Sequence, residues 1–195
     1  MIDKKREAEI VQRRVAIDEM MKKDLEVCKK KSTDYAPDTD CMANLKEWGL
    51  SGIVVRLGDK QHRLENLLKN KREPNNESIA DTLLDIRIYC YLARVFLKVP
   101  FGRLEFDERN KMIEEMMAAD KLSTGLRTIV ESTFTPQTIL QALSYFYAHL
   151  KDLIILTMSS GLPPTSLLTK YFEYYTFATY YAEILIPTKN EKEKT

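Results

Sequence analysis

The sequence predicts an all-α fold, a helical bundle with additional aromatic-rich helices at its C-terminal end. Apolar residues recur at helical spacing through most of the 195 residues, and no segment alternates apolar and polar residues for long. Six glycines and seven prolines leave little room for a β-rich architecture, and no Gly-rich phosphate loop is present. Helix start and stop signals then divide the chain into its elements.

The first helix is predicted over residues 3–31. Its core stripe consists of Ile10, Ile17, Met21, Leu25 and Cys28. A polar loop is expected over residues 32–40, because this stretch contains a proline and few apolar residues. Within it, Asp38 or Asp40 is predicted to cap a short helix that ends at Trp48.

Gly49 and Gly52 indicate a turn before the next helix, which is predicted over residues 51–71. A short polar connector follows. Its Asn76 is predicted to cap a helix over residues 77–98, because asparagine is a favoured residue at this position.

Four further helices are predicted, over residues 107–120, 123–132, 135–160 and 166–186. Thr135-Pro136 gives the clearest start, a capping residue followed by proline at the first helical position. Gly161, followed by two prolines, gives the matching stop.

Seven of the ten tyrosines lie between Tyr145 and Tyr181, a pattern typical of a core or an oligomer interface. We therefore expect a helical core at residues 1–99 and a helical extension at residues 100–187 that packs on it or builds a homo-oligomer. Residues 188–195 are predicted to be a disordered tail.

Composition excludes several classes of function. Thirty basic residues balance 29 acidic ones, so neither a nucleic acid nor an anionic membrane is an expected partner. Three widely spaced cysteines without a CxxC pair indicate reduced thiols. The start of the chain is charged and no apolar stretch is long enough to span a bilayer, so we expect a cytoplasmic protein.

Three acidic residues lie within the predicted helix 77–98. Glu77, Asp81 and Asp85 recur every four residues, and a step of four moves only about 40° around a helix, so the acids form one ridge. The ridge continues into apolar residues, whereas Arg87 and Arg94 lie in another sector. Buried carboxylates need a metal, bases from another element, or protonation. The ridge is therefore a candidate site.

The helix 51–71 supplies the groups expected to face this ridge. A short connector makes the two helices antiparallel, which brings Asp59, Lys60 and Arg63 within reach of the acids. Carboxylate oxygens suit Mg²⁺ or Mn²⁺. The cations Arg56, Lys60 and Arg63, with the Lys29–Lys31 run, would attract a polyphosphate, and the metal would activate water for attack on phosphorus.

The order of these residues resembles the "nucleotide modification associated domain 1" family, which is common in phages and mobile elements. The similarity covers about residues 25–96. It is carried by Lys31 to Tyr35, Asn44-Leu45, Gly52-Ile53, Arg56 to Leu67 and Glu77 to Asp85. This family is similar to the all-α nucleotide pyrophosphohydrolases of the MazG and dimeric dUTPase type. The resemblance implies a MazG-like core and Mg²⁺-dependent hydrolysis of a nucleoside triphosphate to a monophosphate and pyrophosphate.

The resemblance also assigns roles. Asp81 and Asp85 are the first candidates for metal ligands, followed by Glu77 and Asp59. Other positions fall near the substrate, with Asp34, Tyr35 and Asn44 beside the base or sugar and Lys31, Lys60 and Arg63 beside the phosphates. The chain departs from the MazG pattern in lacking the ExxE pair on the first metal helix and in spacing the acids of the second helix by four residues instead of three.

Each assignment has a structural alternative. Acids at helical spacing often form a solvated face, and Asp59 has the spacing to form a buried salt bridge with Arg87 or Arg94. Lys29 to Lys31 suits helix-end charge, and Trp48 suits the core. A second functional hypothesis is therefore a non-catalytic nucleotide-binding or interaction protein on a degenerate bundle, and a third is a structural helical oligomer.

Overall fold

The predicted all-α class is confirmed by a computed structural model, which describes residues 4–35, 40–69, 77–160 and 165–186. Every regular element in these ranges is a helix. The elements are α1 (Lys4–Tyr35), α2 (Ala43–Lys69), α3 (Ile79–Lys98), α4 (Phe106–Leu122), α5 (Thr124–Glu131), α6 (Pro136–Ser160) and α7 (Thr165–Leu185).

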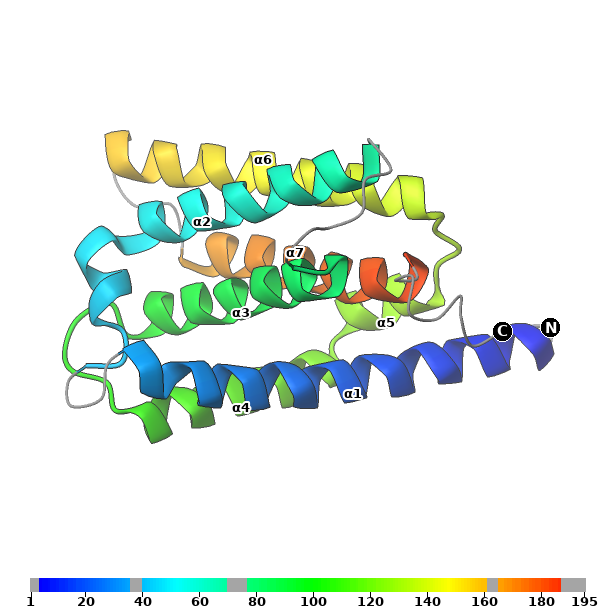
Figure 1. Cartoon of the computed structure of the whole chain (residues 1–195), viewed down its shortest axis with the longest axis horizontal. Helices are drawn as coiled ribbons and strands as arrows, with labels where there is room; N and C mark the ends of the chain where they lie inside the picture. Colours follow the sequence, from blue (N-terminus) through cyan, green and yellow to red (C-terminus); the bar gives the residue numbers. More distant parts are fainter. Residues whose placement is uncertain (1–3, 36–39, 70–76, 161–164, 187–195) are drawn as a thin grey trace.

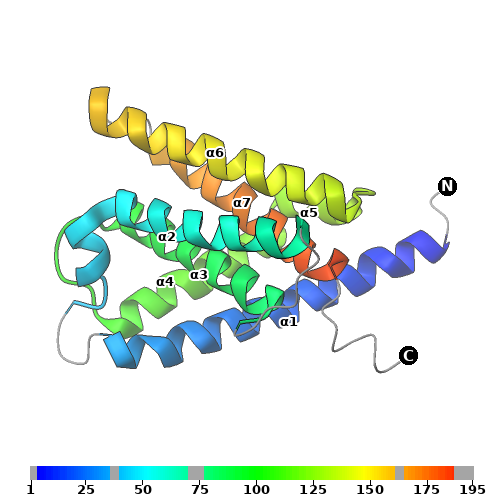
Figure 2. The same ribbon diagram turned by 45° about the horizontal axis from the view of Figure 1, so that its top comes forward.

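The long helices form three layers (Figure 1). Helices α3 and α7 lie side by side in the middle, α2 and α6 cover them on one side, and α1 and α4 cover them on the other. The short α5 packs against α7 between the ends of α4 and α6. Turning the molecule shows α6 at its outer edge (Figure 2). Since α3 and α7 are covered on both sides, each has more buried residues than any other described helix.

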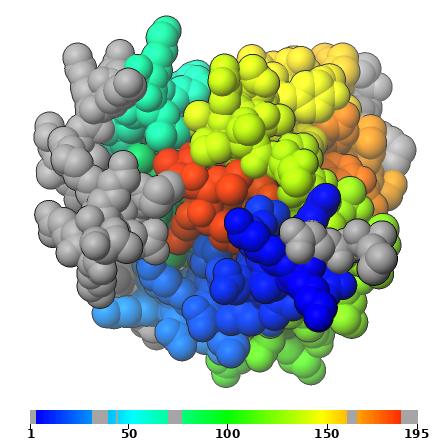
Figure 3. All heavy atoms as spheres, turned by 90° about the vertical axis from the view of Figure 1, so that its right-hand side faces the viewer, coloured from blue at the N-terminus to red at the C-terminus, as the bar shows by residue number. Residues whose placement is uncertain are grey.

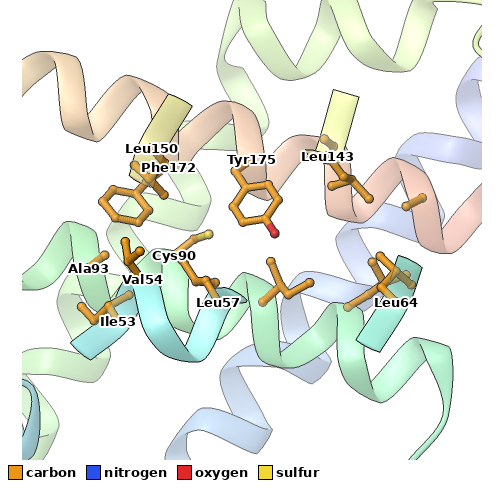
Figure 4. Packing of buried hydrophobic residues seen from close by; sticks show 14 of the residues in the cluster. Ile53, Val54, Leu57, Leu64, Cys90, Ala93, Leu143, Leu150, Phe172 and Tyr175 are labelled. Carbon is orange, nitrogen blue, oxygen red and sulfur yellow. The ribbon is translucent and has the colours of Figure 1, made fainter. Parts of the chain in front are cut away.

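The first core lies between α2, α3, α6 and α7. Leu57, Leu83, Cys90, Leu143 and Tyr175 are buried in it, with side chains from α2 and α3 facing those from α6 and α7 (Figure 4). Residues on both sides of position 100 therefore share one interior. Tyr147 of α6 lies so close to Gly58 of α2 that a side chain at Gly58 would clash with it.

The second core lies on the opposite side of α3 and α7. It joins the α1 residues Ile17 and Met21 to Met116 of α4 and to Phe177 and Tyr180 of α7. The end of α7 is seen between α1 and the segment that leads from α5 into α6 (Figure 3). The buried aromatic residues of α7 therefore lie in both cores, which is one of the two predicted alternatives, whereas Tyr145 of α6 and Tyr174 of α7 are exposed.

Two predicted boundaries are wrong. Helix α1 does not end at residue 31 but continues through Tyr35, into the segment predicted as a loop. Helix α3 begins at Ile79, and its cap is Ser78 rather than Asn76, which lies outside the described residues. Glu77 therefore precedes the helix. The acidic ridge within α3 consists of Asp81 and Asp85 alone.

The start of α2 follows the prediction in part. The Asp40 carboxylate accepts a hydrogen bond from the Met42 amide (3.0 Å), while Asp38 lies outside the described residues. Gly49 breaks the helix with φ 58° and ψ −153°, a backbone conformation that glycine adopts readily. Trp48 was expected in the core but is exposed, with 68% of its surface accessible.

The predicted helices in the second half of the chain are confirmed, with ends that differ from the observed ones by two residues or fewer. Thr135 caps α6 as expected, since its hydroxyl accepts a hydrogen bond from the Thr138 amide (3.2 Å). Helix α6 is described up to Ser160. The predicted stop at Gly161 and the predicted tail at residues 188–195 lie outside the described residues.

Two arginines of α3 are buried between the layers. Arg87 makes two hydrogen bonds to Asp24 of α1 (2.6 and 2.9 Å) and one to Glu183 of α7 (2.5 Å). Arg94 makes two to Asp120 of α4 (2.7 and 2.9 Å). These partners exclude the predicted alternative in which Asp59 pairs with Arg87 or Arg94.

Burial alone would favour the neutral form of Arg87, but the neighbouring Asp24 carboxylate outweighs it and raises the pKa of the guanidinium. The cation is therefore kept in the interior by its partners. Removing one member of such a pair destabilises the folded protein, because the remaining charge is buried without a partner.

The three cysteines are free thiols, as predicted. Burial raises the pKa of the Cys90 thiol to about 12, so this residue is an inert core thiol. None of the described helices is long and apolar enough to cross a membrane.

We expect Arg87→Met to lower the free energy of unfolding by about 3–5 kcal/mol, because it leaves Asp24 buried without a partner. The double variant Arg87→Met/Asp24→Leu should lose less, since both charges are removed. Urea unfolding measures both. Arg103→Met is the control, because the exposed Arg103–Glu105 pair should contribute no more than about 1 kcal/mol. A single-variant loss as small as that of the control would contradict a stabilising role for the buried pair.

Candidate functional site

Charged side chains from three helices meet beside the first half of α3. Lys60 of α2 contacts both Glu77 and Asp85, with its ammonium 3.0 Å from Glu77 Oε2 and 2.7 Å from Asp85 Oδ2. Lys31 of α1 contacts the other oxygen of Asp85 (2.9 Å). We call Lys31, Lys60, Arg63, Glu77 and Asp85 the three-helix cluster.

Arg63 closes the cluster at the start of α3. Its Nη2 donates to the Glu77 carbonyl oxygen (2.5 Å), and its Nε donates to the Thr82 hydroxyl (3.2 Å). The Glu77 carboxylate lies 3.6 Å from Arg63 Nε. Arg63 thus holds Glu77 beside α3, although Glu77 precedes the helix. Sequence reasoning did not single out Thr82, whose only signal was its place beside Asp81.

The packing of α2 on α3 explains why these groups meet. The two helices are connected through residues 70–78, and Leu57, Leu64 and Leu83 pack between them in the first core. Lys60 and Arg63 project from the edge of this contact. Their predicted approach to Glu77 and Asp85 is confirmed by the ion pairs.

Asp85 is the most enclosed acid of the cluster, with 14% of its side chain exposed. Burial would raise the pKa of Asp85, but hydrogen bonds from Lys60 and Lys31 outweigh it and the pKa is lowered. For both lysines, burial opposes the charge, yet the Asp85 carboxylate raises their pKa values. All three groups are therefore charged at neutral pH.

Asp81 lies outside this ion-pair network. Its carboxylate accepts hydrogen bonds from the Ser78 amide (3.2 Å) and hydroxyl (2.7 Å), while the Ser78 hydroxyl accepts from the Asp81 amide (3.0 Å). This reciprocal arrangement is a capping box. The carboxylate is exposed and serves the start of α3.

The remaining predicted site residues are dispersed. Asp59 is exposed on α2 and lies toward α6. Burial of the Tyr147 hydroxyl of α6 is the main cause of its raised pKa, and the negative charge of Asp59 is the second cause. Arg56 is exposed on α2. The helical backbone includes Asp34, Tyr35 and Asn44, but their side chains lie outside the described part of the structure.

The cluster offers two carboxylates and three cations in one place. The Lys60 ammonium contacts both acids, so the distance between Glu77 Oε2 and Asp85 Oδ2 cannot exceed the sum of these two contact distances. Among the described residues, no group of three or more His, Cys, Asp or Glu side chains is arranged to hold a metal ion. A cation held here would need further oxygen atoms from water or substrate.

The comparisons with protein-family models, curated proteins and solved structures find no match for this chain. The geometry of the cluster is therefore the basis for the functional argument that follows.

The cluster predicts a pH-dependent contribution to stability. The folded-state pKa of Asp85 is lowered, so its stabilisation is fully present above the unfolded value of about 3.9 and is lost as the pH falls through the folded value. The two lysines have raised pKa values, so their stabilisation is present below about pH 10.4 and is lost as the pH rises through the folded values.

We therefore expect the free energy of unfolding to differ between the unmodified protein and Asp85→Asn by a constant amount from about pH 6 to 9. This difference should shrink in acid below about pH 4 and in alkali above about pH 10.5. Urea unfolding at a series of pH values measures it. A difference that stays constant down to about pH 2 would show that the carboxylate is not stabilised by the lysines.

Proposed function

We propose that the protein is a Mg²⁺-dependent nucleoside triphosphate pyrophosphohydrolase. One observation carries the proposal: the Lys60 ammonium lies between the Glu77 and Asp85 carboxylates, while Lys31 holds the second oxygen of Asp85. The acids thus already accept a positive charge between them, and further cations lie within contact distance. Carboxylates beside cations are a common combination for binding a divalent cation together with a polyphosphate.

The donor set fits Mg²⁺ better than a metal that needs a complete protein cage. Mg²⁺ keeps several waters and is commonly bound by one or two carboxylates together with substrate phosphates. Glu77 and Asp85 would hold it. When bound, Mg²⁺ or Mn²⁺ lowers the pKa of water and offsets negative charge on the reacting phosphate.

The chain's own cations bind and orient the phosphates. Lys31 and Lys60 exchange Asp85 for phosphate oxygens, and their raised pKa values keep them charged. Arg63 keeps Glu77 in place through its backbone carbonyl. In the reaction, water adds to the α-phosphorus, the bond to the bridging oxygen breaks and pyrophosphate leaves. Base and sugar selection falls to the region of Asp34, Tyr35 and Asn44.

The second candidate function is nucleotide binding without hydrolysis, on a degenerate MazG-like bundle. It is favoured by the positions of Asp81, which serves the capping box, and Asp59, which lies toward α6. With both acids engaged elsewhere, the cluster retains two carboxylates where the related pyrophosphohydrolases are expected to have more. The same lysines would still bind phosphates.

We expect the purified protein to release pyrophosphate and a monophosphate from at least one nucleoside triphosphate in the presence of Mg²⁺ or Mn²⁺. Asp85→Asn should lower kcat by about 100-fold or more, since it removes a carboxylate that would hold the metal, and the metal offsets the negative charge of the transition state. Asp81→Ala is the matched control on the same helix. It should retain turnover while losing about 1 kcal/mol of stability from the capping box.

The melting temperature separates the two candidates. Turnover abolished by Asp85→Asn and retained by Asp81→Ala supports the hydrolase. A rise in melting temperature with nucleotide and Mg²⁺, without turnover, supports binding alone. If no nucleotide gives turnover or a rise in melting temperature, both functions are rejected.

A further inference from the structure

A cavity of about 280 Å³ lies where α1, α4 and α5 meet. Ser123 is the cap residue at the end of α4 and at the start of α5, so the chain bends there. Helix α1 runs past this bend and packs against both helices (Figure 1). The volume is close to the lower end of the usual range for ligand pockets, about 300–1,000 Å³, so the cavity suits a small ligand.

The inner wall of the cavity is apolar. Ile17 of α1 and Leu126 and Val130 of α5 form it, and all three are buried in the second core. Leu122, at the end of α4, also lines the cavity, yet 89% of its surface is exposed. A leucine with this exposure is stabilised when an apolar group covers it. The cavity therefore offers an apolar wall and an apolar lip to a ligand.

The rim of the cavity is cationic. Arg14 of α1 and Arg127 of α5 both contact one atom, Glu131 Oε1, at 2.8 and 2.9 Å. Each guanidinium carries five N–H donors, so both can donate to a second anion as well. Lys121 of α4 also lines the cavity, and its ammonium lies 3.1 Å from Asp18 Oδ1. These three cations are shared between two carboxylates, so a further negative charge is favoured here.

We propose that this cavity binds a small organic acid, with its apolar part between Leu122 and the inner wall and its carboxylate between Arg14 and Arg127. Guanidinium groups bind carboxylates through paired, charge-assisted hydrogen bonds. Burial of the apolar part against the wall adds affinity. A cationic ligand would be repelled by the arginines, and an anion without an apolar part would leave the wall unused. The two parts of the cavity together therefore select an acid with an apolar body.

The cavity is separate from the three-helix cluster. It uses α1 as far as Asp18, whereas Lys31 lies roughly 20 Å further along the same helix. The inference is therefore independent of the proposed function, and its test involves no nucleotide.

Isothermal titration calorimetry on the full chain tests the chemistry of the ligand, with octanoate as the probe. Octanol and octylammonium carry a similar chain with a neutral and a positive head group, and acetate carries the carboxylate without the chain. We expect octanoate to bind, with a dissociation constant at least tenfold lower than that of each of the other three. The proposal is overturned if octanol binds as tightly as octanoate, or if octanoate does not bind below its micelle-forming concentration.

Two variants test the place of binding. Arg127→Gln should raise the dissociation constant of octanoate at least tenfold, because it removes a charge from the rim, and Leu122→Ser should raise it at least threefold, because it removes the apolar lip. Both side chains are exposed, so we expect the fold to be preserved, and circular dichroism verifies this.

The matched controls are Arg103→Gln and Leu156→Ser, which change an exposed arginine and an exposed leucine outside the cavity. Both should leave the dissociation constant unchanged. An effect of Arg127→Gln or Leu122→Ser no larger than that of its control would also overturn the proposal, since octanoate would then bind elsewhere on the protein.

Discussion

The arrangement of the helices depends on the two guanidinium groups that α3 carries into the interior. Arg87 and Arg94 are seven residues apart, so both project from one side of the helix. Their carboxylate partners come from α1, α4 and α7. An unpaired charge in this position would be far more costly than a misplaced apolar residue, so the rotation of α3 is tightly constrained. The charged pairs therefore add a constraint on the orientation of α3 to that of its apolar contacts.

The constraint on Arg87 also determines where Asp85 lies. Asp85 and Arg87 are two residues apart on α3, which corresponds to about 200° around the helix. When Arg87 points toward its partners on α1 and α7, Asp85 therefore points away from them. There it meets Lys60 of α2 and the long side chain of Lys31. The three-helix cluster is thus positioned by the interior of the protein. Lys31, Lys60, Arg63 and Asp85 lie on helices, and Arg63 holds Glu77, which precedes α3. Placement on helices suits a site that must hold charges at fixed distances.

Helix α1 takes part in both arrangements. Asp24 and Lys31 are seven residues apart and lie on one side of α1, Asp24 bound to Arg87 and Lys31 bound to Asp85. The same side of α1 also carries Met21 and Cys28, which are buried in the second core. The same face of α1 therefore supplies a buried anion to the core and a cation to the cluster. This couples the candidate site to the stability of the bundle.

The sequence was most informative where local chemistry decides the structure. The Thr135-Pro136 start of α6 and the expected approach of Lys60 to Glu77 depended on capping and on a short connection, and both are observed. The prediction that Trp48 is a core residue is wrong, because its burial depends on the backbone conformation at Gly49, which residue type alone does not determine. Asn76 and Ser78 are both favoured capping residues, and Ser78 caps α3 because its hydroxyl and Asp81 form a capping box.

Asp24 is the instructive omission. It lies three residues after Met21 and four before Cys28, within the apolar stripe that defined α1, and it is fully buried. An acid on an apolar stripe needs a partner, and this holds for Asp24 of α1 as it does for the acids of α3. Together with Arg87 in the buried sector of α3, Asp24 would have indicated that α1 packs against α3. Opposite charges on two apolar stripes are therefore a signal of helix pairing that periodicity alone does not provide.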